Sequence, residues 1–264
     1  VARRAERCYN YDLGTDKPTS FINFGYWDSL KKGLLAGDNL LFDIKRMDIA
    51  YLEQNKRQHE VTKHISLASF APEALMNLRT NKSIQIKLPE WLFDMDFPGH
   101  YFRRIKSISV SIPCIAGPYT SVSCKLTLNQ SWYRTSPVLV SGQPYDYIDN
   151  YKTVFSGGES IATSNAQNDS GMFEFNFRDE RYLPFEGAGA ISEWTLELPS
   201  KYAQFDLNTI TDVIFHVKYT ARYDGGLKKH ANDYLETEVV AALNNEYLPR
   251  IFSLRHEFAN EWNK

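Results

Sequence analysis

The sequence predicts a mainly β protein with additional helices: an antiparallel β-sandwich domain flanked by a long N-terminal amphipathic helix and short C-terminal helices. Between residues 83 and 219, apolar and polar side chains alternate in several short segments, as in strands with one buried face. Upstream, apolar residues recur every three or four positions, which is typical of an amphipathic helix. Aromatic residues make up 14% of the 264 residues, and this favours sheet.

The N-terminal part is expected to be helical. Residues 1–14 have the pattern of the end of a helix, with Gly14 as its C-cap. A second helix should begin at Asp28, a suitable N-cap, and continue to Ile65. At 1.5 Å per residue it would be about 57 Å long, so we expect its apolar stripe to pack against other helices. The stripe comprises Leu30, Leu34, Leu41, Ile44, Met47 and Tyr51.

The predicted strands place apolar side chains on one face and polar side chains on the other, which indicates two antiparallel sheets packed face to face. Proline ends several of them, because it cannot donate to a ladder. The inward residues are Ile84, Ile86 and Leu88; Ile108, Val110 and Ile112; Val122, Cys124, Leu126 and Leu128; Phe173, Phe175 and Phe177; Trp194, Leu196 and Leu198; and Val213, Phe215, Val217 and Tyr219.

The period is helical again from Asp224 onward, with a break expected at Pro249. We therefore expect a helical segment over residues 1–72 and a β-sandwich domain over residues 73–264 that ends in helical elements. The start at Val1 rather than at Met indicates a piece of a longer protein.

Composition argues against several classes of protein. A formal net charge of -2 provides no basic field for nucleic acid. No run approaches the roughly 18 apolar residues of a membrane-spanning helix, and no signal peptide is visible. Three cysteines, Cys8, Cys114 and Cys124, are too few and too scattered for a disulfide framework or structural zinc. Pairing of Cys114 with Cys124 stays open, although free thiols are favoured.

The sequence "GAGA" raises the question of a phosphate-binding loop. Such a loop follows a strand and opens a helix, whereas Gly187 and Gly189 lead into the predicted strand "ISEWTLELP", and the third glycine is missing. We predict a turn in which both glycines adopt φ values that other residues avoid.

Histidines offer no metal site by their spacing. His59 and His64 lie five residues apart on the predicted helix, away from the i, i+4 geometry that chelates zinc, so solvated helix positions explain them better. His216 falls on the polar face of a predicted strand. We predict no metal and no cofactor.

One acidic group has the residue types for acid–base work or for holding a cation: Asp179, Glu180 and Glu186. Arg178 and Arg181 lie among them, so local ion pairing is favoured. We predict no catalytic site.

Aromatic residues gather near strand ends, at Tyr119, Trp132, Tyr133, Tyr145, Tyr147 and Tyr151. Exposed Tyr and Trp on loops favour contacts with protein or sugar. The alternative is that half of them cover the edges of the sandwich.

Three long stretches carry a family resemblance: "FPGHYFRRIKSISVSIPCIAGPYTSVSCKLTL", "IATSNAQNDSGMFEFNFRDERYLPFEGAGAISEWTLELP" and "FDLNTITDVIFHVKYTAR". They resemble the C-terminal region of the A subunit (TcA) of bacterial Tc toxin complexes. The upstream "FGYWDSLKKGLLAGDNLLFDIKRMDIAYLEQNKRQHEVTKHISL" is similar to the helical segment that precedes this region. The resemblance covers nearly the whole chain.

This resemblance implies a homopentameric, secreted insecticidal toxin subunit that binds host cells and injects a toxic enzyme through a central channel. Its C-terminal β-rich domain would be a non-catalytic docking platform for the TcB–TcC cocoon, seated through the β-propeller of TcB. The long helix would belong to the channel region, and this segment would make no membrane contact itself.

Residue type alone suggests which side chains contact the partner. Tyr makes apolar and hydrogen-bonded contacts at low entropic cost, so the candidates are Tyr119, Tyr133 and Tyr145. Two alternatives remain open: a lectin-like sandwich that binds host-cell glycans, and an enzyme that uses the Asp179–Glu186 cluster.

Overall fold

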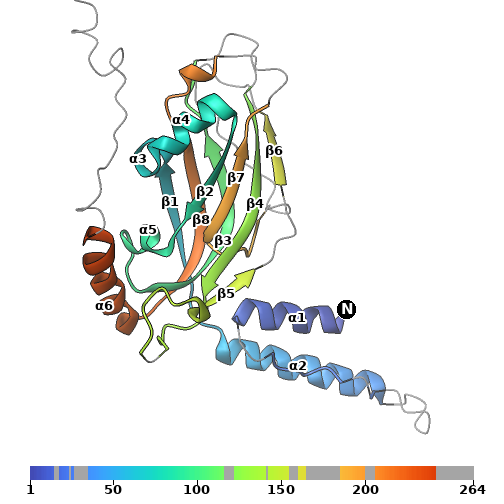
Figure 1. The fold of residues 1–264 in the computed structure, drawn as a ribbon. Coiled ribbons are helices and arrows are strands. Elements are labelled where there is room, and N and C mark those ends of the chain that lie inside the picture. The colour runs from blue at the N-terminus through green and yellow to red at the C-terminus, as the bar shows by residue number, and fades with distance from the viewer. Residues whose placement is uncertain are drawn as a thin grey trace, which may run out of the picture. The chain divides into compact units, whose positions relative to one another are not determined.

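The computed structural model describes residues 1–14, 18–23, 25–26, 35–115, 122–140, 142–154, 160–164, 185–199 and 206–241 (Figure 1). The chain forms two compact units, residues 1–58 and residues 59–264. The boundary between the units follows residue 58, earlier in the sequence than the boundary expected at residue 72. The second unit begins with a strand, β1 (His59–Ser66).

In its described residues, the first unit contains two helices, α1 (Ala2–Leu13) and α2 (Ala36–Gln54). The expected C-cap of α1 is confirmed: Gly14 is left-handed, with φ 66°, and its N–H donates to Asn10 O. A buried cluster joins the helices, as the stripe predicted, with Ile44 and Tyr51 partly buried beside it. Its buried members are Tyr9, Leu13, Phe21, Ile22 and Met47. Leu41 of the stripe is 51% exposed, and Leu30 and Leu34 lie outside the described residues.

The predicted extension of this helix to Ile65 is wrong. The helix ends at Gln54, where Asn55 is extended with ψ 121°, and residues 59–66 form β1. This stretch, "HEVTKHIS", contains β-branched residues that suit a pleated strand. Pairing with a strand about 150 residues later in the sequence decides its conformation, and His59 and His64 therefore lie on a strand. The predicted start, Asp28, lies outside the described residues.

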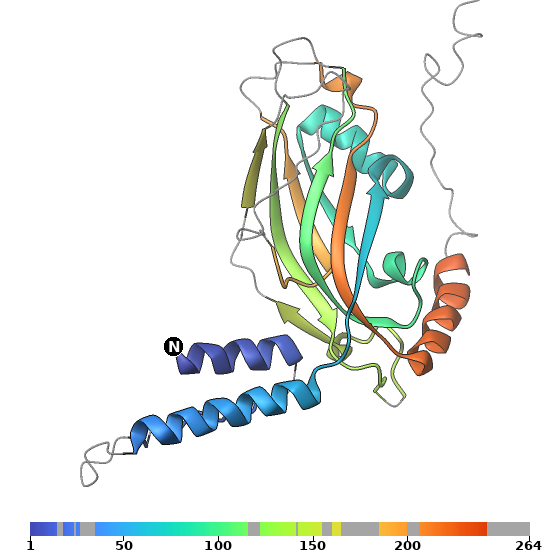
Figure 2. The same ribbon diagram turned by 180° about the vertical axis from the view of Figure 1, so that it is seen from behind.

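Two antiparallel sheets face each other in the second unit (Figures 1 and 2), as predicted. The first sheet has the order β1–β8–β3, with β8 spanning Ile214–Tyr223 and β3 spanning His100–Ser111. The second has the order β2–β7–β4–β5, and β6 also pairs with β4. Its strands are β2 (Ser83–Leu88), β7 (Ile191–Glu197), β4 (Ser123–Arg134), β5 (Tyr151–Val154) and β6 (Ser160–Ser164).

The predicted inward residues form the core between these sheets. The inward residues are all buried in five of the predicted segments, those beginning at Ile84, Ile108, Val122, Trp194 and Val213. Trp194 is fully buried, with its ring centroid 4.9 Å from that of Phe185. Phe173, Phe175 and Phe177 lie outside the described residues. Cys114 and Cys124 are buried free thiols, as favoured.

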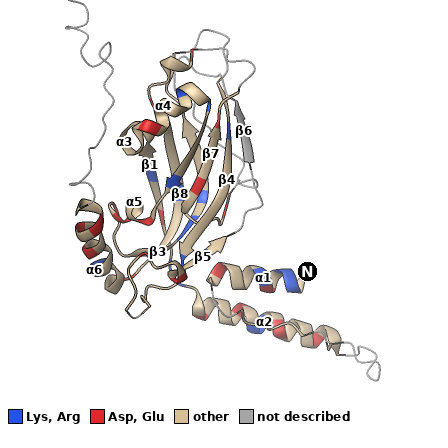
Figure 3. Ribbon diagram, in the orientation of Figure 1, with Lys and Arg blue, Asp and Glu red and all other residues tan. Residues whose placement is uncertain are grey.

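Exposed ion pairs mark the opposite, solvated side of the second sheet. Lys87 pairs with Glu193 at 3.4 Å and Lys125 with Glu197 at 3.3 Å, so opposite charges lie side by side across neighbouring strands (Figure 3). Pairs this exposed add little stability. They do confirm the alternation of wet and dry residues that predicted the strands.

Short helices complete the second unit. They are α3 (Leu67–Phe70), α4 (Pro72–Asn81), α5 (Glu90–Asp94) and α6 (Gly225–Tyr234), with 3-10 turns at Ile148–Asn150 and Leu207–Thr209 and a π-helical turn at Leu235–Val239. The helical period predicted from Asp224 is confirmed at α6, where Asp224 Oδ1 accepts from two backbone N–H groups. The break expected at Pro249 lies outside the described residues.

The two glycines of "GAGA" have different roles. Gly187 has φ 80° in a turn, as predicted. Gly189 does not have a positive φ, so that part of the prediction is wrong. A Cβ at Gly189 would lie 1.9 Å from the carbonyl oxygen of Trp132, so glycine is needed there for the close approach of two backbones.

Candidate functional site: an aromatic pocket beside a buried ion network

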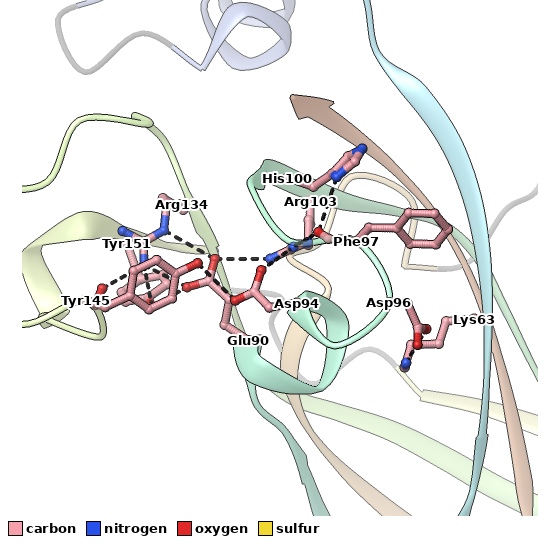
Figure 4. Close-up of polar contacts among 10 residues, drawn as sticks. All are labelled: Lys63, Glu90, Asp94, Asp96, Phe97, His100, Arg103, Arg134, Tyr145 and Tyr151. Carbon is pink, nitrogen blue, oxygen red and sulfur yellow. Dashed lines mark hydrogen bonds and ion pairs between the residues drawn. The ribbon is translucent and has the colours of Figure 1, made fainter. Parts of the chain in front are cut away.

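Four charged side chains meet inside the second unit, beside one end of the sandwich (Figure 4). Arg103 on β3 lies 3.2 Å from Glu90 and 2.6 Å from Asp94, which are the first and last residues of α5. Arg134, the last residue of β4, lies 2.7 Å from Glu90. All four are buried. Two positive and two negative charges balance, which buried ions require, since removing one partner leaves an uncompensated charge.

Two tyrosines attach the segment before β5 to this network. Tyr145 Oη donates to Asp94 Oδ2 at 2.9 Å, and Tyr151 Oη donates to Glu90 Oε2 at 2.5 Å. The Arg134 guanidinium lies 4.3 Å from the Tyr145 ring centroid and donates to the Tyr145 carbonyl oxygen at 2.7 Å. These contacts hold the backbone around residues 145–151 to the ends of β4 and α5.

Burial governs protonation in the network. It raises the pKa of Asp94 to about 6, because the attraction of Arg103 only partly offsets the desolvation of the carboxylate and Glu90 adds repulsion. Burial also raises the pKa of the Tyr145 and Tyr151 hydroxyls far above the usual range, with the Glu90 charge adding to the effect. Both hydroxyls therefore keep their protons and act as donors.

A pocket of about 390 Å³ opens beside the network. Glu90, Tyr145 and Tyr151 contribute to its wall and join it to the buried ions. Trp91, Trp132 and Tyr234 supply further aromatic surface, and Lys87 and Asp146 add charge. Aromatic walls with a few polar groups are typical of binding pockets.

A second, more polar hollow of about 460 Å³ adjoins the first and shares Tyr145, Asp146 and Tyr234 with it. Asp233 and Glu238 line it, so carboxylates outnumber cationic groups here. Three exposed apolar side chains lie in the same loop region, on residues 138–148: Val138, Val140 and Ile148. Exposed apolar residues that gather beside aromatic groups, with polar groups around them, are characteristic of a surface that contacts another protein.

Two of the three predicted contact tyrosines lie close to this site. Tyr133 on β4 is fully buried, with its ring centroid 5.0 Å from that of Phe102, and Tyr145 is 6% exposed. Both belong to one apolar cluster. Tyr119 lies outside the described residues. Neither buried ring offers much surface to a partner, and a direct contact role for the three tyrosines stays a prediction.

Sequence reasoning missed the ion network. A signal for it exists in "HYFRRIK", where Arg103 interrupts the apolar alternation of a strand. An arginine at such a position indicates a buried counter-ion, but the sequence does not say which carboxylate supplies it.

The acidic group predicted from the sequence lies only partly within the described residues. Glu186 is exposed, and Asp179 and Glu180 lie outside the described residues. Within the described ranges, three or more His, Cys, Asp or Glu side chains nowhere gather as a metal site. In the same ranges, the helices are too short or too polar to span a bilayer.

Comparison with known proteins identifies the family. Residues 1–221 match the family model described as "Tc toxin complex TcA C-terminal TcB-binding domain". The chain is 38% identical over 231 residues to toxin subunit YenA2 of Yersinia entomophaga, covering 84% of this chain and 17% of that protein. The chain therefore belongs to the TcA C-terminal TcB-binding domain family, and the resemblance inferred from its sequence is confirmed.

Solved structures of Tc toxin proteins have a similar fold. The chain is similar to TcdA4 of Morganella morganii, with a TM-score of 0.57 and 25% identity over 84% of this chain and 10% of that one. It shares its fold with the Yersinia pseudotuberculosis TcaA-TcaB structure, with a TM-score of 0.58 and 22% identity over 84% of this chain and 13% of that one. The chain thus spans less than a fifth of the length of these relatives.

Proposed function

We propose that this chain is the docking domain of a Tc toxin A subunit and binds the TcB subunit of a TcB–TcC cocoon. The family match over residues 1–221 carries the proposal. In this role the chain is non-catalytic, and it acts outside the bacterium within a pentameric A subunit. The toxic activity belongs to another subunit, and this segment makes no membrane contact of its own.

The pocket end of the sandwich is the surface that best suits a protein partner. Its aromatic walls give a large contact area, and Ile148, which is 72% exposed, gives an apolar anchor beside them. The buried network supports this role, because its hydrogen bonds to Tyr145 hold the backbone of the segment that carries Ile148. A surface held rigid before binding loses less entropy on docking.

Two isoleucines make a matched test. Ile148 and Ile115 are 72% and 68% exposed. Ile148 comes shortly before β5, and Ile115 comes shortly after the end of β3; the start of β5 and the end of β3 lie at opposite ends of the sandwich (Figure 1). In the full-length A subunit, Ile148→Asp should weaken binding of the TcB–TcC cocoon by about tenfold or more, because a charge would be buried in an apolar contact. Ile115→Asp should leave the dissociation constant unchanged.

Other results of these binding measurements would change the proposed docking surface or the proposed function. Weakening by Ile115→Asp alone would move the docking surface to the other end of the sandwich while keeping TcB as the partner. No binding of the cocoon by the wild-type subunit would refute the proposal. Binding to a glycan array without cocoon binding would favour the lectin-like alternative.

A further inference from the structure

Two histidines lie opposite each other on the outer face of the three-stranded sheet, which Figure 2 shows with β3, β8 and β1 side by side. The antiparallel register pairs His64 on β1 with His216 on β8. Their Nδ1 atoms are 2.5 Å apart and their ring centroids 4.7 Å apart. Lys63, Ile65, Phe215 and Val217, which flank them along the strands, are buried, so both imidazoles lie on the outer face.

A third strand orients one of these rings. His216 Nε2 lies 2.7 Å from the hydroxyl oxygen of Ser111 on β3. When Nε2–H donates to this oxygen, the lone pair of His216 is at Nδ1, the atom that faces His64. A hydrogen bond from the far ring nitrogen is what fixes the tautomer and orientation of most metal-ligating histidines.

We propose that His64 and His216 bind one divalent transition-metal ion through their Nδ1 atoms, with water in the remaining coordination positions. Imidazole nitrogen suits copper, nickel and zinc, and copper binds such ligands most tightly. Metal–nitrogen bonds of the usual length at a tetrahedral angle separate the two nitrogens by about 3.3 Å. The rings must therefore move apart by roughly 0.8 Å, and His64, whose side chain is exposed, has room to do so.

Nearby charge does not oppose a cation strongly. Lys218 lies two residues from His216 along β8, on the same face, whereas Lys63, which is adjacent to His64, is buried on the other face. Glu60 pairs with Lys218 at 3.8 Å and with Lys106 at 2.9 Å. The carboxylate offsets part of the positive charge on this face.

A metal ion at this site would strengthen the attachment of β1 to its sheet. In the described structure β1 pairs with β8 alone, and it is the strand that directly follows the helical unit. A metal bridging His64 and His216 would link β1 to the central strand by bonds other than the ladder. Because the metal would bind the folded state, it should raise Tm with increasing metal concentration.

Titration of the whole chain with Cu²⁺, added as its glycine complex so that weak surface ligands do not compete, tests the proposal. We expect one equivalent to bind and Tm to rise. His64→Ala and His216→Ala should each weaken binding by about tenfold or more and remove the rise in Tm, since half of the protein ligands are lost. His230→Ala on α6 is the matched control and should bind as the wild type does.

Unchanged binding in both His64→Ala and His216→Ala would overturn the proposal. Electron paramagnetic resonance of the wild-type copper complex decides independently of how the variants fold. Hyperfine coupling to two imidazole nitrogens supports the site, whereas coupling to one or none overturns it.

Discussion

Replacing Arg134 with methionine would test how the buried network holds the pocket end together. The guanidinium donates to Glu90 at 3.2 and 2.7 Å, to the Tyr145 carbonyl oxygen at 2.7 Å and to Tyr151 Oη at 2.9 Å. Methionine fills most of the volume but donates nothing, so the network keeps two carboxylates and one guanidinium. Removing one partner of a buried ion pair costs about 3–5 kcal/mol, and we expect a loss of this size in the free energy of unfolding.

Urea unfolding of single and double variants separates charge from packing. Glu90→Gln alone leaves one excess positive charge, whereas Arg134→Met with Glu90→Gln leaves only the Arg103–Asp94 pair, which is neutral. The double variant should therefore lose less than the sum of the single losses, by about 1–3 kcal/mol. Arg134→Lys is the conservative control, because it keeps the charge without the planar fork. A loss below about 1 kcal/mol for Arg134→Met, or strictly additive losses, would refute the reasoning.

Three further predictions follow from particular residues. Gly189→Ala should cost about 1–3 kcal/mol in urea unfolding, because its Cβ would lie 1.9 Å from Trp132 O; an unchanged midpoint would contradict this. The folded state binds the Asp94 proton more tightly than the unfolded state does, since its pKa is raised from 3.8 to about 6. The stability of the wild type relative to Asp94→Asn should therefore fall as pH rises from about 4 to 6, by on the order of 3 kcal/mol, and a flat difference would exclude the raised pKa. A thiol reagent should modify Cys8 rapidly in the native protein but Cys114 and Cys124 only after unfolding, as mass spectrometry of labelled peptides would show.

The strands were predictable because their signal is local. Side-chain alternation at Ile84, Ile86 and Leu88, or at Phe215 and Val217, follows from a period of two and needs no knowledge of the partner strand. The end of α2 was not predictable in this way. The eight residues of β1 are too few for periodicity to distinguish strand from helix, and pairing with β8 decides their conformation.

The site was harder to predict than the fold. Glu90, Arg103 and Arg134 come from separate stretches of sequence, and charged residues are expected at the surface until the fold brings them together. Tyr133 lies near a strand end, as expected, but at a buried position of β4 that its residue type does not indicate. Residue type predicts the class of contact, but its burial depends on the neighbouring elements.

The position of β1 has a mechanical consequence. Its ladder with β8 contains eight residue pairs, from His59–Ala221 to Ser66–Ile214, and the preceding helical unit is attached at its first residue. Tension along the strand would load the whole ladder in shear, because interstrand hydrogen bonds lie perpendicular to the strands. Tension across the strand would instead peel the pairs apart one after another. The force that this junction withstands should therefore depend on the direction of pulling.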